Sequence, residues 1–202
     1  MQKPIPLILA SQSPRRAELL REAGVDFEQR SPPYADPDQP PKYLRGEQAE
    51  QYAASLAQRK AQSLLDELTR PAWVLAADTI CVDDQGQLVG KPIDRADAER
   101  MIRLFMNTTH RVITGVTLLG PGDQSGETFS DTATVRMGAI ADDRLAVYID
   151  TDGWRGKAGA YNLFDRQADG WPIRVTGDPT TVVGLPMRRL MPMLTASLHS
   201  HE

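Results

Sequence analysis

Apolar positions along the chain fall into short runs and periodic stretches that alternate. Runs of strand length occupy residues 5–10 and 73–77, and apolar side chains alternate with polar ones over 111–119 and 128–137. Apolar residues also recur at helical spacing from about residue 47 to residue 68. Strands that alternate with helices are typical of α/β proteins, so we expect one central sheet flanked by helices.

The ends of the predicted helices carry capping residues. Ser13 is a good N-cap and Pro14 suits the first helical position, so a helix should begin there and end near Gly24. Asp94 can cap a second helix that runs to about Phe105. The other predicted elements are a hairpin that joins 80–82 to 88–89, a helix at 142–151, a strand at 171–175 and a last helix that begins at Pro186.

Three stretches are predicted to be loops. Residues 31–41 hold five prolines and should form an exposed, extended segment, 120–127 is polar, and 153–161 is too rich in glycine for a regular element. The chain has no internal repeat and no sharp change of composition. We therefore expect a single domain over residues 1–198, with two lobes about a cleft, and a frayed tail at 199–202.

Charge and cysteine content narrow the classes of function. The 202 residues are 41% hydrophobic and carry a formal net charge of -4 at pH 7. This charge gives no general attraction to nucleic acid or to an acidic membrane, so an anionic ligand would need a local basic cluster. The single cysteine, Cys81, excludes an intrachain disulfide and fits a reducing compartment. With no secretory signal and no run of about 18 apolar residues, we expect a cytoplasmic protein without membrane contact.

The turn after the first predicted strand has the features of a phosphate site. Ser11, Ser13, Arg15 and Arg16 place two hydroxyls and two guanidinium groups at the start of a helix. Free backbone N–H groups and the positive end of the helix dipole favour an anion there. A capped surface helix with two solvated arginines has the same signals, so both interpretations stand for this turn alone.

Further charged residues occupy positions where they could face a ligand. Lys60 lies on the apolar face of the predicted long helix, and its ammonium either reaches water past that face or points at an anion in a cleft. Asp78 follows a buried strand, where α/β sheets bind ligands, although an acid that begins a turn is also common. Lys91 lies on the rigid bend at 90–92, and Lys157 lies on the glycine-rich loop.

Two acids suggest a metal ion beside the basic groups. Asp36 lies in the proline-rich loop and Asp78 at the strand end, and carboxylate oxygens suit Mg²⁺ or Mn²⁺. A phosphate chain with a divalent cation fits this set. Other motifs are missing from the sequence: Gly156 and Lys157 lack the rest of a P-loop, no Gly-x-Gly-x-x-Gly follows a strand, and the histidines lack zinc-site spacing.

Six short motifs, in order along the chain, resemble those of one family. They are SQSPRR at 11–16, AADT at 76–79, GKP at 90–92, TGV at 114–116, KAGAY at 157–161 and VGLP at 183–186. On these motifs the chain resembles the Maf family of nucleoside triphosphate pyrophosphatases over nearly its whole length. The resemblance implies a single α/β domain with a central mixed, twisted sheet and a cleft, a divalent metal ion, and a cytoplasmic homodimer.

The resemblance also implies a role for each matching residue. The family's phosphate-binding positions match Ser11, Ser13, Arg15, Arg16, Lys60, Lys91 and Lys157. Asp78 matches the proton acceptor, and Asp36 stands where relatives usually carry a glutamate that helps to hold the metal.

Three positions linked to base selectivity match Arg15, Thr79 and Phe164. The ring of Phe164 can only stack or pack, so it predicts a broader base preference than that of the thymidine and uridine triphosphate type. Alternatively, Phe164 is a core residue and another residue contacts the base.

The implied reaction is hydrolysis of a nucleoside triphosphate to the monophosphate and diphosphate, a house-cleaning activity on nucleotide pools. Two other classes stay open: a catalytically silent nucleotide- or nucleic-acid-binding regulator that keeps the pocket, and a phosphatase that releases orthophosphate. Asp78 favours an enzyme, because a silent binder has little need of an acid among cations. No stable nucleic acid complex is expected.

Overall fold

The computed structural model describes residues 5–121 and 126–199 of the 202-residue chain. The middle of the predicted loop at 120–127 and residues 200–202 of the predicted tail therefore lie outside the described residues. The last helix, α7 (Met187–His199), continues to the final described residue.

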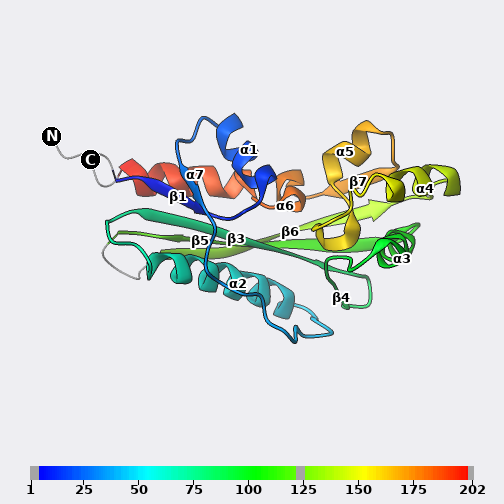
Figure 1. Cartoon of the computed structure of the whole chain (residues 1–202), viewed down its shortest axis with the longest axis horizontal. Helices are drawn as coiled ribbons and strands as arrows, with labels where there is room; N and C mark the ends of the chain where they lie inside the picture. The colour runs from blue at the N-terminus through cyan, green and yellow to red at the C-terminus, as the bar shows by residue number, and fades with distance from the viewer. Residues whose placement is uncertain (1–4, 122–125, 200–202) are drawn as a thin grey trace.

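Seven strands of the described residues form one mixed sheet (Figure 1). They are β1 (Leu7–Ala10), β2 (Glu28–Arg30), β3 (Trp73–Val82), β4 (Leu88–Val89), β5 (Thr109–Leu119), β6 (Gly126–Met137) and β7 (Ile173–Thr176). Their order is β2-β1-β3-β5-β6-β7, and β4 pairs with β3. β1 pairs in parallel with β2 and β3, whereas β5, β6 and β7 follow in antiparallel pairs. The predicted α/β domain with a mixed sheet is confirmed.

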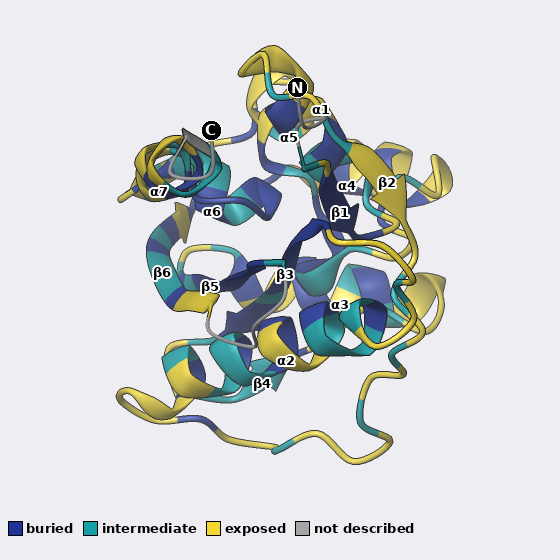
Figure 2. Cartoon of the chain, turned by 90° about the vertical axis from the view of Figure 1, so that its left-hand side faces the viewer, coloured by how far each residue is buried: buried dark blue, intermediate teal, exposed yellow. Residues whose placement is uncertain are grey.

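Helices cover both faces of the sheet (Figures 1 and 2). α2 (Gln48–Leu65) packs on one face against β3 and β5. α1 (Pro14–Glu22), α6 (Pro179–Val183) and α7 pack on the other face. α3 (Arg95–Phe105), α4 (Asp142–Asp150), the short 3₁₀ turn η1 (Ala158–Ala160) and α5 (Leu163–Ala168) gather at one end of the sheet.

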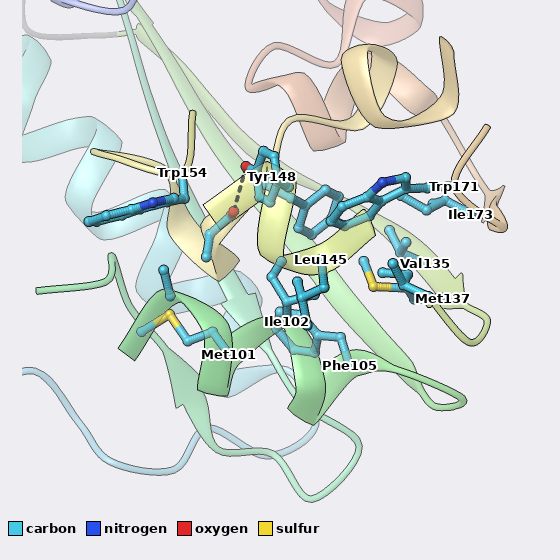
Figure 3. Packing of buried hydrophobic residues seen from close by; sticks show 14 of the residues in the cluster. Met101, Ile102, Phe105, Val135, Met137, Leu145, Tyr148, Trp154, Trp171 and Ile173 are labelled. Carbon is cyan, nitrogen blue, oxygen red and sulfur yellow. Dashed lines mark hydrogen bonds between the residues drawn. The ribbon is translucent and has the colours of Figure 1, made fainter. Parts of the chain in front are cut away.

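That end of the molecule has an apolar core of its own (Figure 3). Phe105, Trp154 and Trp171 are buried in it, and the Tyr148 hydroxyl donates a hydrogen bond of 2.8 Å to the carbonyl of Ala160. This bond holds η1 against α4. A second core lies between the sheet and helices α1, α6 and α7. Two further clusters lie between the sheet and α2. The two lobes stay a prediction.

The cap and periodicity signals identify α1 and α2 correctly. Ser13 is the N-cap of α1, its side chain accepting from the backbone N–H of Arg16, and Pro14 is the first helical residue. α2 buries a stripe of small and branched apolar residues against the sheet: Ala49, Ala53, Leu56, Ala57, Ala61 and Leu64. Opposite this stripe lies Gly115 of β5, where a Cβ atom would stand 2.2 Å from the carbonyl oxygen of Ala53. Glycine in the TGV motif therefore permits a close approach of α2 to the sheet.

The prediction that the second strand ends at Ala77 is wrong. β3 runs without interruption from Trp73 to Val82, because β5 pairs with it over this whole length. The first arm of the predicted hairpin is thus the end of β3, and β4 is the second arm. Four short elements were not predicted: β2, whose residues are all exposed, the 3₁₀ turn η1, and helices α5 and α6 of six and five residues. Periodicity cannot identify elements this short.

His110 makes the stability of the fold depend on pH. It is 1% exposed, stacks on Phe105 and bonds through Nε2 to the Tyr161 hydroxyl, while Nδ1 has no partner among the described residues. Burial lowers its pKa from 6.5 to about 3. Above pH 6.5 both the folded and the unfolded chain hold it neutral, and below that pH only the unfolded chain takes up the proton. The contribution of neutral His110 to the free energy of unfolding is therefore fully present above pH 6.5, and it is lost as the pH falls toward about 3.

We predict that lowering the pH from 7 to 5 reduces the free energy of unfolding of the wild type by about 2 kcal/mol more than that of His110→Gln. Urea unfolding at the two pH values measures this difference. Glutamine can still reach Tyr161 but does not titrate, so it separates the histidine from the carboxylates. Equal pH dependence in both proteins would contradict the prediction.

Candidate active site

A gap in the pairing of β3 forms the floor of a cavity. One edge of β3 pairs with β5 from Val74 to Val82. The other edge pairs with β1 as far as Ala76 and with β4 from Cys81 onward, so within the described part of the chain 77–80 have no strand partner on that edge. A cavity of about 630 Å³ opens at this gap.

The cavity brings together the predicted site residues from distant parts of the chain. Its lining includes Ser11, Ser13, Arg15, Arg16, Asp36, Lys60, Asp78, Thr79, Lys91 and Lys157. They come from the β1–α1 turn, the proline-rich loop, α2, β3, the bend after β4 and the segment before η1. The convergence of these side chains, which spacing alone does not establish, is thus present in the structure.

Asp78 is buried at the gap and its carboxylate pairs with the ammonium of Lys60. Lys60 also lies 3.0 Å from Asp36, so it bridges two carboxylates, one from β3 and one from the loop. Burial lowers the pKa of Lys60, but Asp78 and Asp36 outweigh it and raise that pKa overall. Of the two interpretations of Lys60, an ammonium turned into the cleft is the one that the structure shows.

The position of Lys60 depends on the glycine in β5. Gly115 is the cross-strand partner of Asp78, and cross-strand partners face the same side of a sheet. Because Gly115 has no side chain, α2 lies close to the sheet, with Ala53 against the glycine and Lys60 two turns further along the same helix. Gly115 of the TGV motif therefore contributes through packing.

Arg15, Lys91 and Lys157 supply further positive charge to the cavity wall. Within the described residues neither Arg15 nor Lys91 takes part in an ion pair, and Lys157 donates a hydrogen bond to the carbonyl of Gly153. Burial lowers the pKa of Arg15, and burial followed by the charge of Arg15 lowers that of Lys157. A bound anion would favour the charged form of both groups.

Arg16 lines the cavity but is bonded to the protein. Its guanidinium donates to the carbonyls of Gly184 and Ala77, at 2.9 and 2.7 Å. It also donates to the hydroxyls of Ser11 and Thr79, at 3.2 and 3.0 Å. Burial lowers its pKa, although Asp78 opposes the effect. Arg16 therefore differs from its neighbour Arg15, whose head group makes no such bonds within residues 5–121 and 126–199.

Phe164 lies apart from the other predicted residues. It is on α5, is 44% exposed, and is not among the residues that line the cavity. The alternative that it is a core residue is wrong, because the first turn of α5 turns Leu163 inward and leaves Phe164 outside. Its role in base selectivity stays a prediction.

Several lining residues were missed by sequence reasoning. Tyr34 faces Lys60, whose ammonium lies 5.6 Å from the ring centre, and its proximity to Asp36 in the same loop is the signal that could have identified it. Arg155 and Asn162 flank the KAGAY motif and also line the cavity. Arg155 pairs with Asp152 at 3.2 Å and stacks on Trp154, so its head group is already held by neighbours.

A nucleophilic thiol finds little support at this site. Burial raises the pKa of the Cys81 thiol well above its ordinary value, which makes it a poor nucleophile. Among the described residues no group of three or more His, Cys, Asp or Glu side chains is placed to hold a metal ion. No helix of the described residues has the length and apolar character needed to cross a bilayer.

Comparison with known proteins identifies the family of this chain. The model of the family described as Maf-like protein matches residues 6–197. The chain belongs to the Maf family.

Three curated Maf relatives, each named dTTP/UTP pyrophosphatase, match almost the full length. The protein of Salinibacter ruber is 39% identical and the alignment covers 98% of this chain and 93% of the relative. The protein of Koribacter versatilis is 41% identical, and the alignment covers 93% of this chain and 92% of the relative. The protein of Exiguobacterium sibiricum is 40% identical, and the alignment covers 95% of this chain and 92% of the relative. Among solved structures, a HAM1 protein from Coxiella burnetii matches with a TM-score of 0.49 and 12% identity, covering 95% of this chain and 99% of that one.

Proposed function

We propose that this Maf protein is a nucleoside triphosphate pyrophosphatase, which converts a nucleoside triphosphate and water into the monophosphate and diphosphate. The observation that carries the proposal is a buried carboxylate, Asp78, at the floor of a cavity whose wall holds Arg15, Lys91 and Lys157. The names of the curated relatives support the same reaction and suggest thymidine and uridine triphosphates as substrates. A cytoplasmic homodimer stays a prediction.

The residues of the cavity have two roles in this reaction, proton transfer and stabilisation of charge. Asp78 accepts a proton from a water molecule whose oxygen attacks the α-phosphorus. The bond between that phosphorus and the bridging oxygen breaks, and diphosphate leaves with the electron pair. Arg15, Lys91 and Lys157 stabilise the charge that develops on the leaving group, which is the main catalytic contribution in phosphoryl transfer.

The acids of the site fit a divalent cation that arrives with the nucleotide. Asp36 and Asp78 already converge on one cation, the Lys60 ammonium. Mg²⁺ is commonly held by one or two carboxylates together with substrate phosphates, so two acids suffice when a triphosphate is present. A bound Mg²⁺ or Mn²⁺ would neutralise phosphate charge and polarise the P–O bonds. Asp36 and Asp78 would hold it, and Lys60 would then turn toward the phosphates.

We predict that the purified protein releases diphosphate, not orthophosphate, from a nucleoside triphosphate in the presence of Mg²⁺ or Mn²⁺. The assay compares thymidine, uridine, cytidine, guanosine and methylguanosine triphosphates and identifies the phosphate product of each. Orthophosphate as the sole product would establish a phosphatase instead. Tight nucleotide binding without turnover would favour the silent regulator.

Asp78→Asn should lower kcat by about a hundredfold or more, the low end of what a positioned general base supplies. Nucleotide binding should survive, because the amide is isosteric and the basic residues stay in place. Initial rates, calorimetric nucleotide binding and circular dichroism test this. A folded Asp78→Asn protein with near-normal kcat would refute the assignment of the base.

Lys60 should compete with the metal ion for the two carboxylates. We predict that the protein without nucleotide binds Mn²⁺ weakly, and that Lys60→Met binds it about tenfold more tightly, within the range of coupling for close charge pairs. Electron paramagnetic resonance of free Mn²⁺ measures this without turnover. Lys91→Met, which removes an equal charge from the cavity rim, is the control, and an equal gain in that variant would contradict the prediction.

A further inference from the structure

The AADT motif around Asp78 is held by a ring of buried hydrogen bonds. Thr79 Oγ1 lies 2.9 Å from Thr114 Oγ1, and the Thr114 hydroxyl donates at 2.8 Å to the carbonyl of Thr181 in α6. Thr114 and Thr181 are fully buried. Arg16 closes the ring, because it donates to Thr79 on one side and to Gly184, at the end of α6, on the other. The ring therefore links α1, β3, β5 and α6.

The donors of Arg16 are almost all committed to this ring and its surroundings. A guanidinium has five N–H groups, and among the described residues four of them donate to Gly184, Ala77, Ser11 and Thr79. Ala77 and Thr79 are the residues on either side of Asp78. Arg16 thus holds the backbone before the carboxylate and the side chain after it, across the gap where no strand pairs.

The backbone of Gly184 is a second observation that supports this role of Arg16. Its φ of +121° lies where side chains are rarely tolerated, and a Cβ atom there would stand 2.9 Å from Arg16 Nε and 3.4 Å from Thr79 Oγ1. The glycine of the VGLP motif therefore leaves the space that the guanidinium fills.

We infer that Arg16 is a positioning residue, which fixes Asp78 at the unpaired edge of β3, and that Arg15 is the arginine of this pair that contacts the phosphate chain. The inference rests on the proposed pyrophosphatase function and deepens it. It separates two adjacent arginines to which sequence similarity gives the same role.

The first test compares Arg16→Lys with Arg15→Ala in kcat and in the Kd of inorganic diphosphate measured by calorimetry. Lysine keeps the charge but cannot reproduce the four bonds of the guanidinium. Arg16→Lys should lower kcat by about a hundredfold, as a displacement of about 1 Å at a reacting group does, and change Kd by less than about threefold. Arg15→Ala should raise Kd by about tenfold. If Arg16→Lys weakens diphosphate binding as much as Arg15→Ala and keeps kcat, Arg16 is a ligand and the inference is wrong.

A second variant perturbs Arg16 without replacing it. Gly184→Ala should lower kcat in the same direction as Arg16→Lys, because the added methyl group displaces the guanidinium. Gly177→Ala is the matched control: its φ of +107° imposes similar backbone strain, its nearest neighbours belong to β6, and it does not line the cavity. Equal losses in the two alanine variants would overturn the inference.

The third test separates this inference from the proposed function. Urea unfolding of the wild type, Arg16→Lys, Thr79→Val and the double variant gives the free energy of unfolding of each protein. Because the ring joins the two residues, the effects of the two substitutions on this free energy should be non-additive. If the wild type hydrolyses no nucleotide, the proposed function fails, and the positioning role is then judged from the unfolding data alone. Non-additive effects of the two substitutions support this role, and additive effects overturn it.

Discussion

The unpaired edge of β3 is the constraint on which the site depends. Buried backbone carbonyls and N–H groups need partners, and a strand that continues past its neighbour loses the usual ones. β1 ends at Ala10, opposite Ala76, while β3 continues to Val82. The carbonyl of Ala77 accepts from Arg16 instead of from a strand. The space that another strand would occupy is thereby left as a cavity whose floor is a regular, rigid element.

The alternation of side chains along β3 divides the functions of its residues. Neighbouring side chains in a strand point to opposite faces. Asp78 faces α2 and meets Lys60, whereas Thr79 faces α1 and α6 and joins the buried hydrogen bonds there. One dipeptide at the gap thus supplies a charged group on the α2 side of the sheet and a structural link on the α1 and α6 side. A register shift of one residue would exchange these roles.

Charge in the cavity opposes charge in the rest of the molecule. The chain as a whole carries -4, yet the cavity lining includes more basic than acidic side chains, and both acids are bound to Lys60. Arg15 and Lys157 are partly buried, and burial lowers the pKa of each although Asp165 opposes the effect. On the proposed function, a polyanion would meet this excess of positive charge, whereas the net charge of -4 gives no general attraction to long nucleic acids. The arrangement selects small, highly charged ligands.

Part of the fold and of the candidate site could be predicted from the sequence, and there are physical reasons why the rest could not. Caps and periodicity identified α1 and α2, because those signals are local, and the motifs contain five of the charged residues of the cavity: Arg15, Arg16, Asp78, Lys91 and Lys157. The end of β3 was misjudged because its length is set by pairing with β5, which no local pattern records. The contact between Lys60 and Asp78 depends on how closely α2 packs over Gly115. The exposure of Phe164 depends on the orientation of α5, a helix too short to show periodicity.

Arg15 and Arg16 illustrate how one motif can hold two functions. Successive residues on an α-helix point about 100° apart, so two adjacent arginines in its first turn cannot face the same partner. Given the position of α1 over β3, one guanidinium must turn inward toward the unpaired edge and the other must stay beside the cavity. The inward one meets Gly184 of the VGLP motif and Ala77 and Thr79 of the AADT motif. The charge of Arg16 therefore completes the fold, and on the proposed function the charge of Arg15 meets an anion.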